Sequence, residues 1–324
     1  PRHFARPRPE PDTGRYRRWR QRARIQVGQS HLTTADLSPD GSLLLVLSEA
    51  EALARIYDAR TKRLFASFPL PGYDRFDRGA VRFYRGEGPP TLVFAGEAGL
   101  QLLDAMTGEV VATVDERGGW SMRWSPDRRY LVVVRSAIPA QRSWMAFYEA
   151  TGPRALRFVA EIPFEHRVDD WDLSDDDRLL ATVTYPDDRV TLYDLHAGEA
   201  LWSIPAPEFS NAVDISPDGK RVVVGGDRVV LIDSLDPTRR AVNTGFGNNI
   251  HRARFTPSGD AIFTSSYDGR VRVFAPRLDR EAELPRIKVL RHGGHANVYD
   301  LSFTRDGDGL WSSSGDRSVR RWGR

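Results

Sequence analysis

VDISPDG, residues 213–219, is one of seven related phrases along this chain of 324 residues. Most of them read apolar–x–apolar, then Ser or Thr, then Pro-Asp-Gly or a relative of it, then an apolar run. The others are ADLSPDG at 35–41, VRFYRGEG at 81–88, MRWSPD at 122–127, WDLSDDD at 171–177, ARFTPSG at 253–259 and LSFTRDG at 301–307. Equivalent positions in successive phrases lie 40 to 49 residues apart. Seven repeats of this length, each with several strands, predict an all-β, seven-bladed β-propeller.

Each repeat has room for four short strands. In the first repeat these are HLTTADLS at 31–38, SLLLVLSE at 42–49, ARIYDAR at 54–60 and RLFASF at 63–68. Alternation with a period of two and a high content of β-branched residues favour strands over helices. Pro, Asp and Gly between the first two strands occupy favoured turn positions. We therefore expect four-stranded blades.

The last repeat lacks a fourth strand, because the sequence given ends at Arg324, directly after SVRRW at 318–322. A spare strand pattern, RARIQVG at 22–28, precedes the first repeat. We expect this segment to complete the last blade, which would remove an exposed sheet edge. The predicted division is an extended Arg- and Pro-rich arm at 1–21 and a propeller at 22–324.

GHANVYDLSFTRDGDGLWSSSGDRSVRRW, residues 294–322, resembles a WD40 repeat, and the resemblance extends over residues 25–324. It implies a buried chain of hydrogen bonds in the last blade, formed by His295, Ser314, Asp316 and Trp322. The sixth repeat keeps the turn aspartate, Asp268, but has Phe274 in place of the tryptophan. His295 beside Asp316 is also the arrangement of a catalytic pair. We favour the structural role, because a buried histidine needs partners for its ring nitrogens.

Composition excludes several kinds of site. The chain has no cysteine, so it has neither disulfides nor thiolate chemistry. His31, His166 and His251 precede inner strands but lack the close spacing of metal ligands, so we expect no metal and no cofactor. Only three of the 47 basic residues are lysines, which is typical of a GC-rich bacterial genome. No apolar run approaches the ~18 residues of a membrane span. The sequence opens with proline and has no secretory pattern, so we expect a cytoplasmic protein, with peripheral membrane association as the alternative.

Charged residues recur at the middle of the inner strands. In blade order they are Asp36, Arg82, Arg123, Asp172, Asp214 and Arg254. Taken two by two in blade order, these residues are of opposite sign, so we expect inter-blade ion pairs Asp36–Arg82, Arg123–Asp172 and Asp214–Arg254 near the ring axis. A charged channel that binds a small ion is the competing interpretation.

Basicity and exposed aromatics point to recognition. Residues 1–24 carry nine arginines against two acids, whereas the remainder is net acidic. We expect the arm to bind a partner through Arg15, Tyr16, Arg17, Arg18, Trp19 and Arg20. We expect the loops of one face to add Tyr73, Arg75, Phe76, Arg78 and Phe246.

The sequence therefore predicts a non-catalytic scaffold subunit of a larger bacterial assembly that binds one or more protein partners and no small-molecule substrate. Two alternatives stay open. One is a propeller enzyme of lactonase-like or cofactor-dependent type. The other is an adaptor that binds nucleic acid or anionic membrane through residues 1–24.

Overall fold

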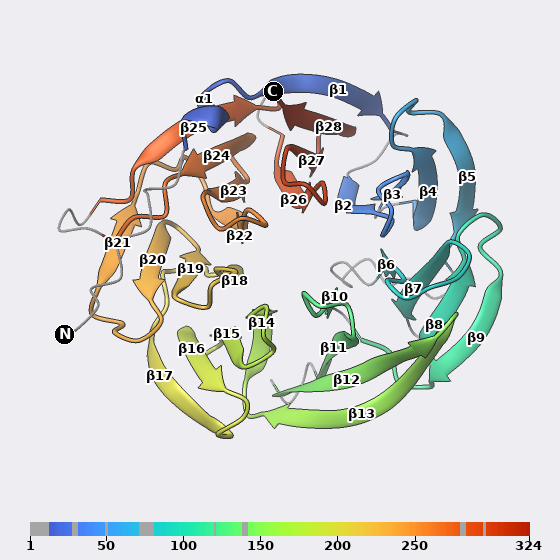
Figure 1. Ribbon diagram of the computed structural model, residues 1–324, viewed down its shortest axis with the longest axis horizontal. Helices are drawn as coiled ribbons and strands as arrows, with labels where there is room; N and C mark the ends of the chain where they lie inside the picture. The colour runs from blue at the N-terminus through green and yellow to red at the C-terminus, as the bar shows by residue number, and fades with distance from the viewer. Residues whose placement is uncertain are drawn as a thin grey trace, which may run out of the picture.

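Seven four-stranded antiparallel sheets form a closed ring in the computed structural model (Figure 1), which confirms the expected seven-bladed propeller. The structure describes residues 13–27, 32–48, 51–70, 81–96, 98–119, 121–137, 142–278, 283–293 and 296–324. The blades are numbered here in chain order, and the first strand of each lies nearest the ring axis.

The strands of the first four blades follow one another along the chain. Blade 1 contains β2 (Leu32–Leu37), β3 (Leu43–Ser48), β4 (Leu53–Asp58) and β5 (Leu64–Pro69). Blade 2 contains β6 (Val81–Phe83), β7 (Thr91–Gly96), β8 (Gly99–Asp104) and β9 (Val110–Asp115). Blade 3 contains β10 (Ser121–Trp124), β11 (Tyr130–Ala137), β12 (Arg142–Gly152) and β13 (Ala155–Phe164). Blade 4 contains β14 (Arg167–Leu173), β15 (Leu179–Tyr185), β16 (Arg189–Asp194) and β17 (Glu199–Pro205).

The remaining blades bring the two ends of the chain together. Blade 5 contains β18 (Ala212–Ile215), β19 (Arg221–Gly225), β20 (Val229–Asp233) and β21 (Arg240–Asn243). Blade 6 contains β22 (Ile250–Phe255), β23 (Ile262–Ser266), β24 (Arg270–Phe274) and β25 (Arg286–Arg291). Blade 7 contains β26 (Val298–Phe303), β27 (Gly309–Ser314), β28 (Ser318–Gly323) and, as its outer strand, β1 (Arg20–Gln26). The short helix α1 (Gly14–Arg17) precedes β1.

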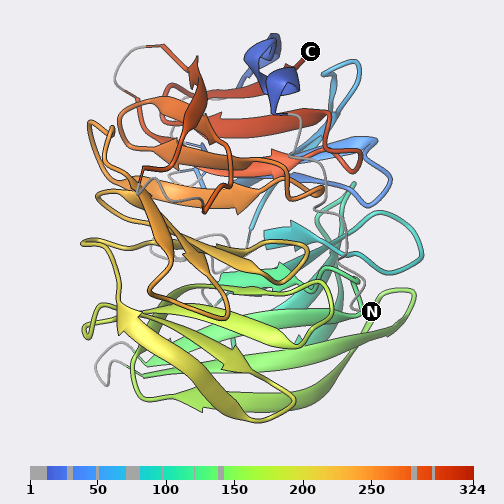
Figure 2. The same cartoon turned by 60° about the vertical axis from the view of Figure 1, so that its left-hand side comes forward.

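β1 closes the ring, as the sequence predicts. It pairs antiparallel with β28, from Arg20 opposite Gly323 to Gln26 opposite Ser318. Figure 2 shows α1 on the outer rim, close to the end of the chain. Blade 7 therefore draws its strands from both ends of the described chain.

A hydrogen-bonded turn explains why the phrase recurs. In blade 5 the Ser216 hydroxyl donates to Asp218 Oδ1 at 2.6 Å and accepts the Arg221 N–H at 3.0 Å. Gly219 follows with a φ of 67°, in the left-handed region that glycine tolerates best. The same hydroxyl–carboxylate bond forms in the pairs Ser38–Asp40, Ser125–Asp127, Ser174–Asp176 and Thr304–Asp306. The turn thus fixes the reversal between the first two strands of a blade.

Apolar residues pack between blades rather than within them. Along β19, Val222 and Val224 face the cluster shared with blade 4, whereas Val223 faces the cluster shared with blade 6. Both faces of the sheet are buried, so the strand is apolar at successive positions instead of alternating. No blade can bury these faces alone, and the ring depends on every neighbour contact.

Candidate functional site

The N-terminal aromatics are core residues. The Tyr16 side chain is fully buried, and its hydroxyl donates to Asp260 Oδ1 at 2.6 Å. Trp19 is 2% exposed, and both rings pack against Phe263, with centroid distances of 5.4 and 5.2 Å. Arg15 forms an ion pair with Asp260 at 2.9 Å. These three side chains therefore attach the N-terminal segment to blade 6. They are not the exposed anchors for a partner that the sequence analysis expects.

The other arginines of this segment point to solvent. Arg17, Arg18 and Arg20 are exposed, as are Arg22 and Arg24 farther along β1. In the described part of the chain, none of the five lies within ion-pair distance of a carboxylate. Burial of Tyr16 and Trp19 thus leaves a surface of arginines without aromatic rings between them.

Two of the three expected axial ion pairs are present. Arg254 Nη1 lies 3.1 Å from Asp214 Oδ1, and Arg123 Nη1 lies 3.8 Å from Asp172 Oδ1. The Asp214 carboxylate also accepts the Phe255 N–H from the next blade, at 2.7 Å. Both pairs therefore join the inner strands of neighbouring blades.

The third expected pair is wrong. Asp36 contacts Arg85 at 2.5 Å and accepts the Phe83 N–H at 2.8 Å. Arg82 instead lies 3.7 Å from Asp300 of blade 7. The carboxylate still joins blade 1 to blade 2, but its cation is three residues farther along the chain, just beyond β6.

Three axial residues escaped the sequence analysis: Asp170, Arg252 and Asp300. Each lies two positions before the middle residue of its inner strand. Residues two apart share one face of a strand, so this spacing was the signal that could have found them. Asp170 hydrogen-bonds to Arg123, and Asp300 Oδ1 lies 3.6 Å from Arg252 Nε.

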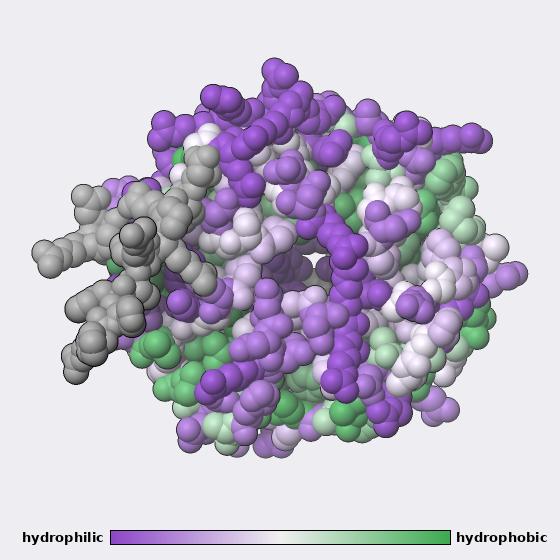
Figure 3. Space-filling model, viewed as in Figure 1, coloured by the Kyte–Doolittle hydropathy of each residue, from purple (hydrophilic) through white to green (hydrophobic). Residues whose placement is uncertain are grey.

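The axial carboxylates and arginines are buried, and burial disfavours their charged forms. Burial, followed by the charge of Asp172, raises the pKa of Asp214 well above its usual value. Burial also raises the pKa of Asp172 and lowers that of Arg123 to about 10. Figure 3 shows a narrow opening at the centre of the ring. Each of these arginines contacts an aspartate of another blade, so we interpret the set as ion pairs that link the inner strands of different blades.

A buried polar chain does exist in blade 7, with partly different members. Trp322 Nε1 donates to the Ser312 hydroxyl at 2.7 Å, and His292 Nε2 lies 2.6 Å from the same oxygen. The expected His295 lies outside the described residues. The linking hydroxyl is that of Ser312 rather than Ser314, whose Oγ accepts the Asp316 N–H at 3.2 Å.

Asp316 anchors the other side of this chain. Its Oδ2 lies 3.8 Å from His292 Nδ1 and 2.6 Å from Arg320 Nη2. Burial opposes ionisation, but the nearby His292 ring, the Ser318 hydrogen bond and the charge of Arg320 hold the pKa of Asp316 well below its usual value. Burial lowers the pKa of His292, and its Nε2 shares a hydrogen bond with the Ser312 hydroxyl. Ser312 and Asp316 thus engage most of the polar atoms of this cluster, which favours a structural role, while His292 Nδ1 has no hydrogen-bond partner within the described structure.

Blade 6 repeats the arrangement with different side chains. Asp268 accepts from Arg272 at 2.6 Å and from the Gly247 N–H at 3.1 Å. The Arg272 guanidinium stacks on Phe246 at 4.4 Å, and the Phe274 ring lies 6.0 Å from Phe246. Phe246 is therefore half-buried and engaged within its blade, in contrast to the expected exposed anchor. The other expected loop residues, Tyr73, Arg75, Phe76 and Arg78, lie outside the described residues.

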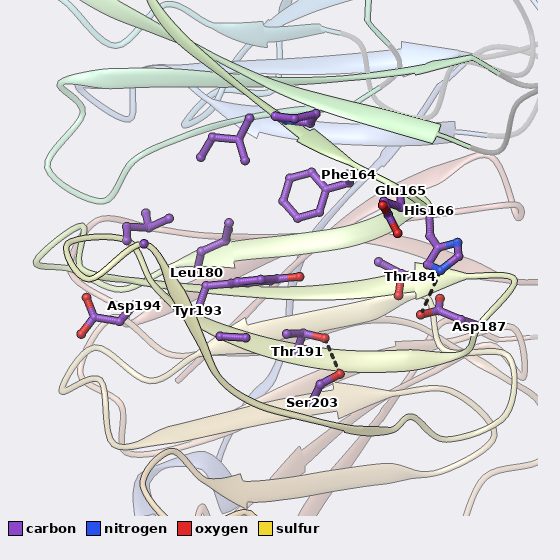
Figure 4. A pocket seen from close by; sticks show the side chains of 15 residues that line it. Phe164, Glu165, His166, Leu180, Thr184, Asp187, Thr191, Tyr193, Asp194 and Ser203 are labelled. Carbon is purple, nitrogen blue, oxygen red and sulfur yellow. Dashed lines mark hydrogen bonds and ion pairs between the residues drawn. The ribbon is translucent and has the colours of Figure 1, made fainter.

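A pocket of about 540 Å³ opens between β13 and blade 4 (Figure 4). His166 Nε2 lies 3.8 Å from Asp187 Oδ2 at one end, and both side chains are partly exposed. Phe164 and Tyr193 pack edge to face, with ring centroids 6.0 Å apart. Among the residues that the structure describes, no three His, Asp or Glu side chains group as metal ligands. No described helix is long and apolar enough to cross a membrane.

Comparison with known families and proteins agrees with this geometry. The model of the WD domain, G-beta repeat, matches residues 240–274 and 286–323. Each match begins at the outer strand of one blade and ends with the third strand of the next. The chain is a WD40-like β-propeller.

Mouse WD repeat-containing protein 90 is similar to this propeller, with 25% identity over 175 residues. The alignment covers 53% of the chain but only 8% of the mouse protein. This similarity supports the repeat type. The activity and partners of that much longer protein are not carried over to the WD40-like ring.

Proposed function

We propose that this propeller is a non-catalytic scaffold that binds protein partners within a larger assembly. WD40-like propellers are generally interaction scaffolds rather than enzymes. The polar groups that converge in this ring support the same role. The axial aspartates pair with axial arginines, and Ser312 hydrogen-bonds with His292 and Trp322, so both sets contact other residues of the ring rather than a substrate. The predicted loop face, with Tyr73, Arg75, Phe76 and Arg78, remains part of the proposal.

The observation that carries the proposal is a set of exposed apolar side chains on three successive outer strands. They are Leu64 and Phe65 on β5, Val110 and Val111 on β9, and Phe158 and Val159 on β13, each 40–47% exposed. We call these six residues the apolar wall. Figure 3 shows hydrophobic residues along the right-hand rim, where Figure 1 places β5 and β9. Apolar exposure that recurs on adjacent blades favours a protein interface over solvent.

An affinity-tagged chain expressed in its source cells tests this proposal. We expect it to elute well above its own 36.6 kDa with a defined, stoichiometric partner. Replacing Phe65, Val111 and Phe158 by Ser should release that partner. Leu235→Ser, which removes an 88% exposed side chain in blade 5, is the matched control and should retain it.

The pocket of Figure 4 makes an enzyme the second candidate, because His166 and Asp187 could act as an acid–base pair. A monomeric chain that hydrolyses lactones or esters, and loses this activity in His166→Ala, would overturn the scaffold proposal. A chain with a defined partner and no such turnover would support it.

A further inference from the structure

The outer edge of blade 7 carries an unusual excess of free positive charge. Five exposed arginines lie on α1, on β1 and, in the case of Arg18, between them, and Arg291 of β25 is exposed as well. We call Arg17, Arg18, Arg20, Arg22, Arg24 and Arg291 the basic edge. Arg320 connects its parts, since Nη1 donates to the Arg291 carbonyl and to Gln21 Oε1, each at 3.2 Å. Lys288 adds a further cation and donates to the Arg17 carbonyl at 3.0 Å.

Several exposed arginines elsewhere on the ring have acidic partners, although Arg60, Arg63 and Arg240 have none within ion-pair distance among the described residues. Arg129 lies 3.0 Å from Glu149, Arg178 lies 2.8 Å from Asp194, and Arg239 lies 2.9 Å from Asp233. In the described chain no such carboxylate faces the six arginines of the basic edge. The edge thus concentrates positive charge on a ring whose residues 25–324 are net acidic.

β1 also presents a free sheet edge. Within the described residues it pairs only with β28, so alternate backbone N–H and C=O groups point outward. Ala23 and Ile25 are buried toward blade 1, whereas the arginines between and before them are exposed. Arg22 is the extra residue of a β-bulge. The bulge and the arginines of β1 disfavour pairing with a neutral strand. A strand that carries carboxylates would instead be attracted by the arginines.

We propose that the basic edge binds an acidic, extended peptide segment of a protein partner, which adds to β1 as a further strand. This inference rests on the proposed role as an interaction scaffold. Carboxylates on the added strand face Arg20, Arg22 and Arg24, and its backbone satisfies the outward N–H and C=O groups.

A nucleic acid fits this surface less well. Tyr16 and Trp19, the aromatics that would stack on bases, are buried against Phe263. Outward carbonyl groups of β1 need donors, which a peptide supplies and a phosphate backbone lacks. An anionic membrane fits less well for a related reason, since the described basic edge has no exposed aromatic or aliphatic anchor.

Fluorescence anisotropy with a labelled ten-residue peptide of alternating Asp and Val tests the proposal on the full chain. We expect saturable binding that weakens about tenfold when Arg20, Arg22 and Arg24 are replaced by Gln. Replacing Arg60, Arg63 and Arg240 by Gln changes the net charge equally on other blades and should leave the affinity within about twofold. A peptide N-methylated at alternate residues keeps its charge but loses backbone donors, and should bind at least about tenfold more weakly.

Four results would overturn the proposal: no peptide binding, equal binding by both triple variants, equal binding of the N-methylated peptide, or tighter binding of a single-stranded oligothymidine or of phosphatidylserine vesicles. Circular dichroism and the denaturation midpoint of each variant confirm that it is folded. The scaffold proposal is judged separately, by co-purification of the natural partner. It stands if that partner is retained while the peptide fails to bind.

Discussion

Single hydroxyl groups hold the buried chain of blade 7 together. Ser312 is fully buried and joins Trp322 to His292. Ser312→Ala leaves both partners without this oxygen and should lower the free energy of unfolding by about 1–3 kcal/mol. Ser313 is the matched control, because its hydroxyl is buried without a hydrogen-bond partner in the described structure. Ser313→Ala should be neutral or slightly stabilising in urea denaturation, and equal losses at both serines would contradict this assignment.

Asp177 makes the turn of blade 4 sensitive to pH. It has a φ of 55°, at the turn position where blade 5 has Gly219. Burial, followed by the charges of Asp127 and Asp176, raises its pKa to about 6. A carboxyl with a raised folded pKa binds more protons in the folded state, so its contribution to stability is lost as pH rises from about 4 to about 6.

Asp177→Asn should therefore raise the free energy of unfolding at pH 7 and flatten its dependence on pH between about 4 and 6. Asp188→Asn makes the same chemical change at another residue with positive φ and serves as the control. Denaturation in urea across this range measures both variants. An unchanged pH profile in Asp177→Asn would contradict a raised pKa for this carboxyl.

At the scale of strands and blades, the axial ion pairs link neighbouring blades, and their contribution to stability can be tested directly. Asp214 and Arg254 belong to neighbouring inner strands and lie 3.1 Å apart. Removing Asp214 alone leaves a buried guanidinium, and we expect a loss of about 3–5 kcal/mol. A double-mutant cycle with Ala at both positions should give a coupling energy of about 0.5–3 kcal/mol. The exposed pair Arg129–Glu149 should give a smaller coupling energy, because solvent screens it. Equal coupling in the two pairs would argue that the axial groups are solvated.

Elements and their order were predictable from the sequence because the turn phrase repeats in nearly every blade. The closing strand was predictable because one repeat lacked a strand and a spare one preceded the first. The polar chain was harder. Ser312 and Ser314 lie on the same face of β27, and only the β27–β28 register, with Leu310 opposite Trp322, decides between them. Arg82 and Arg85 raised the same difficulty, because the reach of a side chain beyond β6 does not follow from periodicity.

The largest error concerned the N-terminal segment. Its arginines and prolines are typical of a solvated arm, and the pocket that takes Tyr16 and Trp19 is built about 240 residues later in the chain, around Asp260 and Phe263. No local pattern reveals such a contact. The same segment thus has an inward face that packs against blade 6 and an outward face that is basic.

At the scale of the whole molecule, this ring is closed by its N-terminal segment, and the proposed basic edge depends on that closure. Chemical denaturation of Trp19→Ala, with Arg18→Ala as its exposed neighbour, tests the closure most directly. Because Trp19 is 2% exposed and packs on Phe263, its truncation should lower the free energy of unfolding by about 3–5 kcal/mol. Arg18→Ala should change it by no more than about 0.5 kcal/mol. Equal stability of Trp19→Ala and the unaltered chain would contradict the account, because the segment would then be a free arm rather than part of the ring.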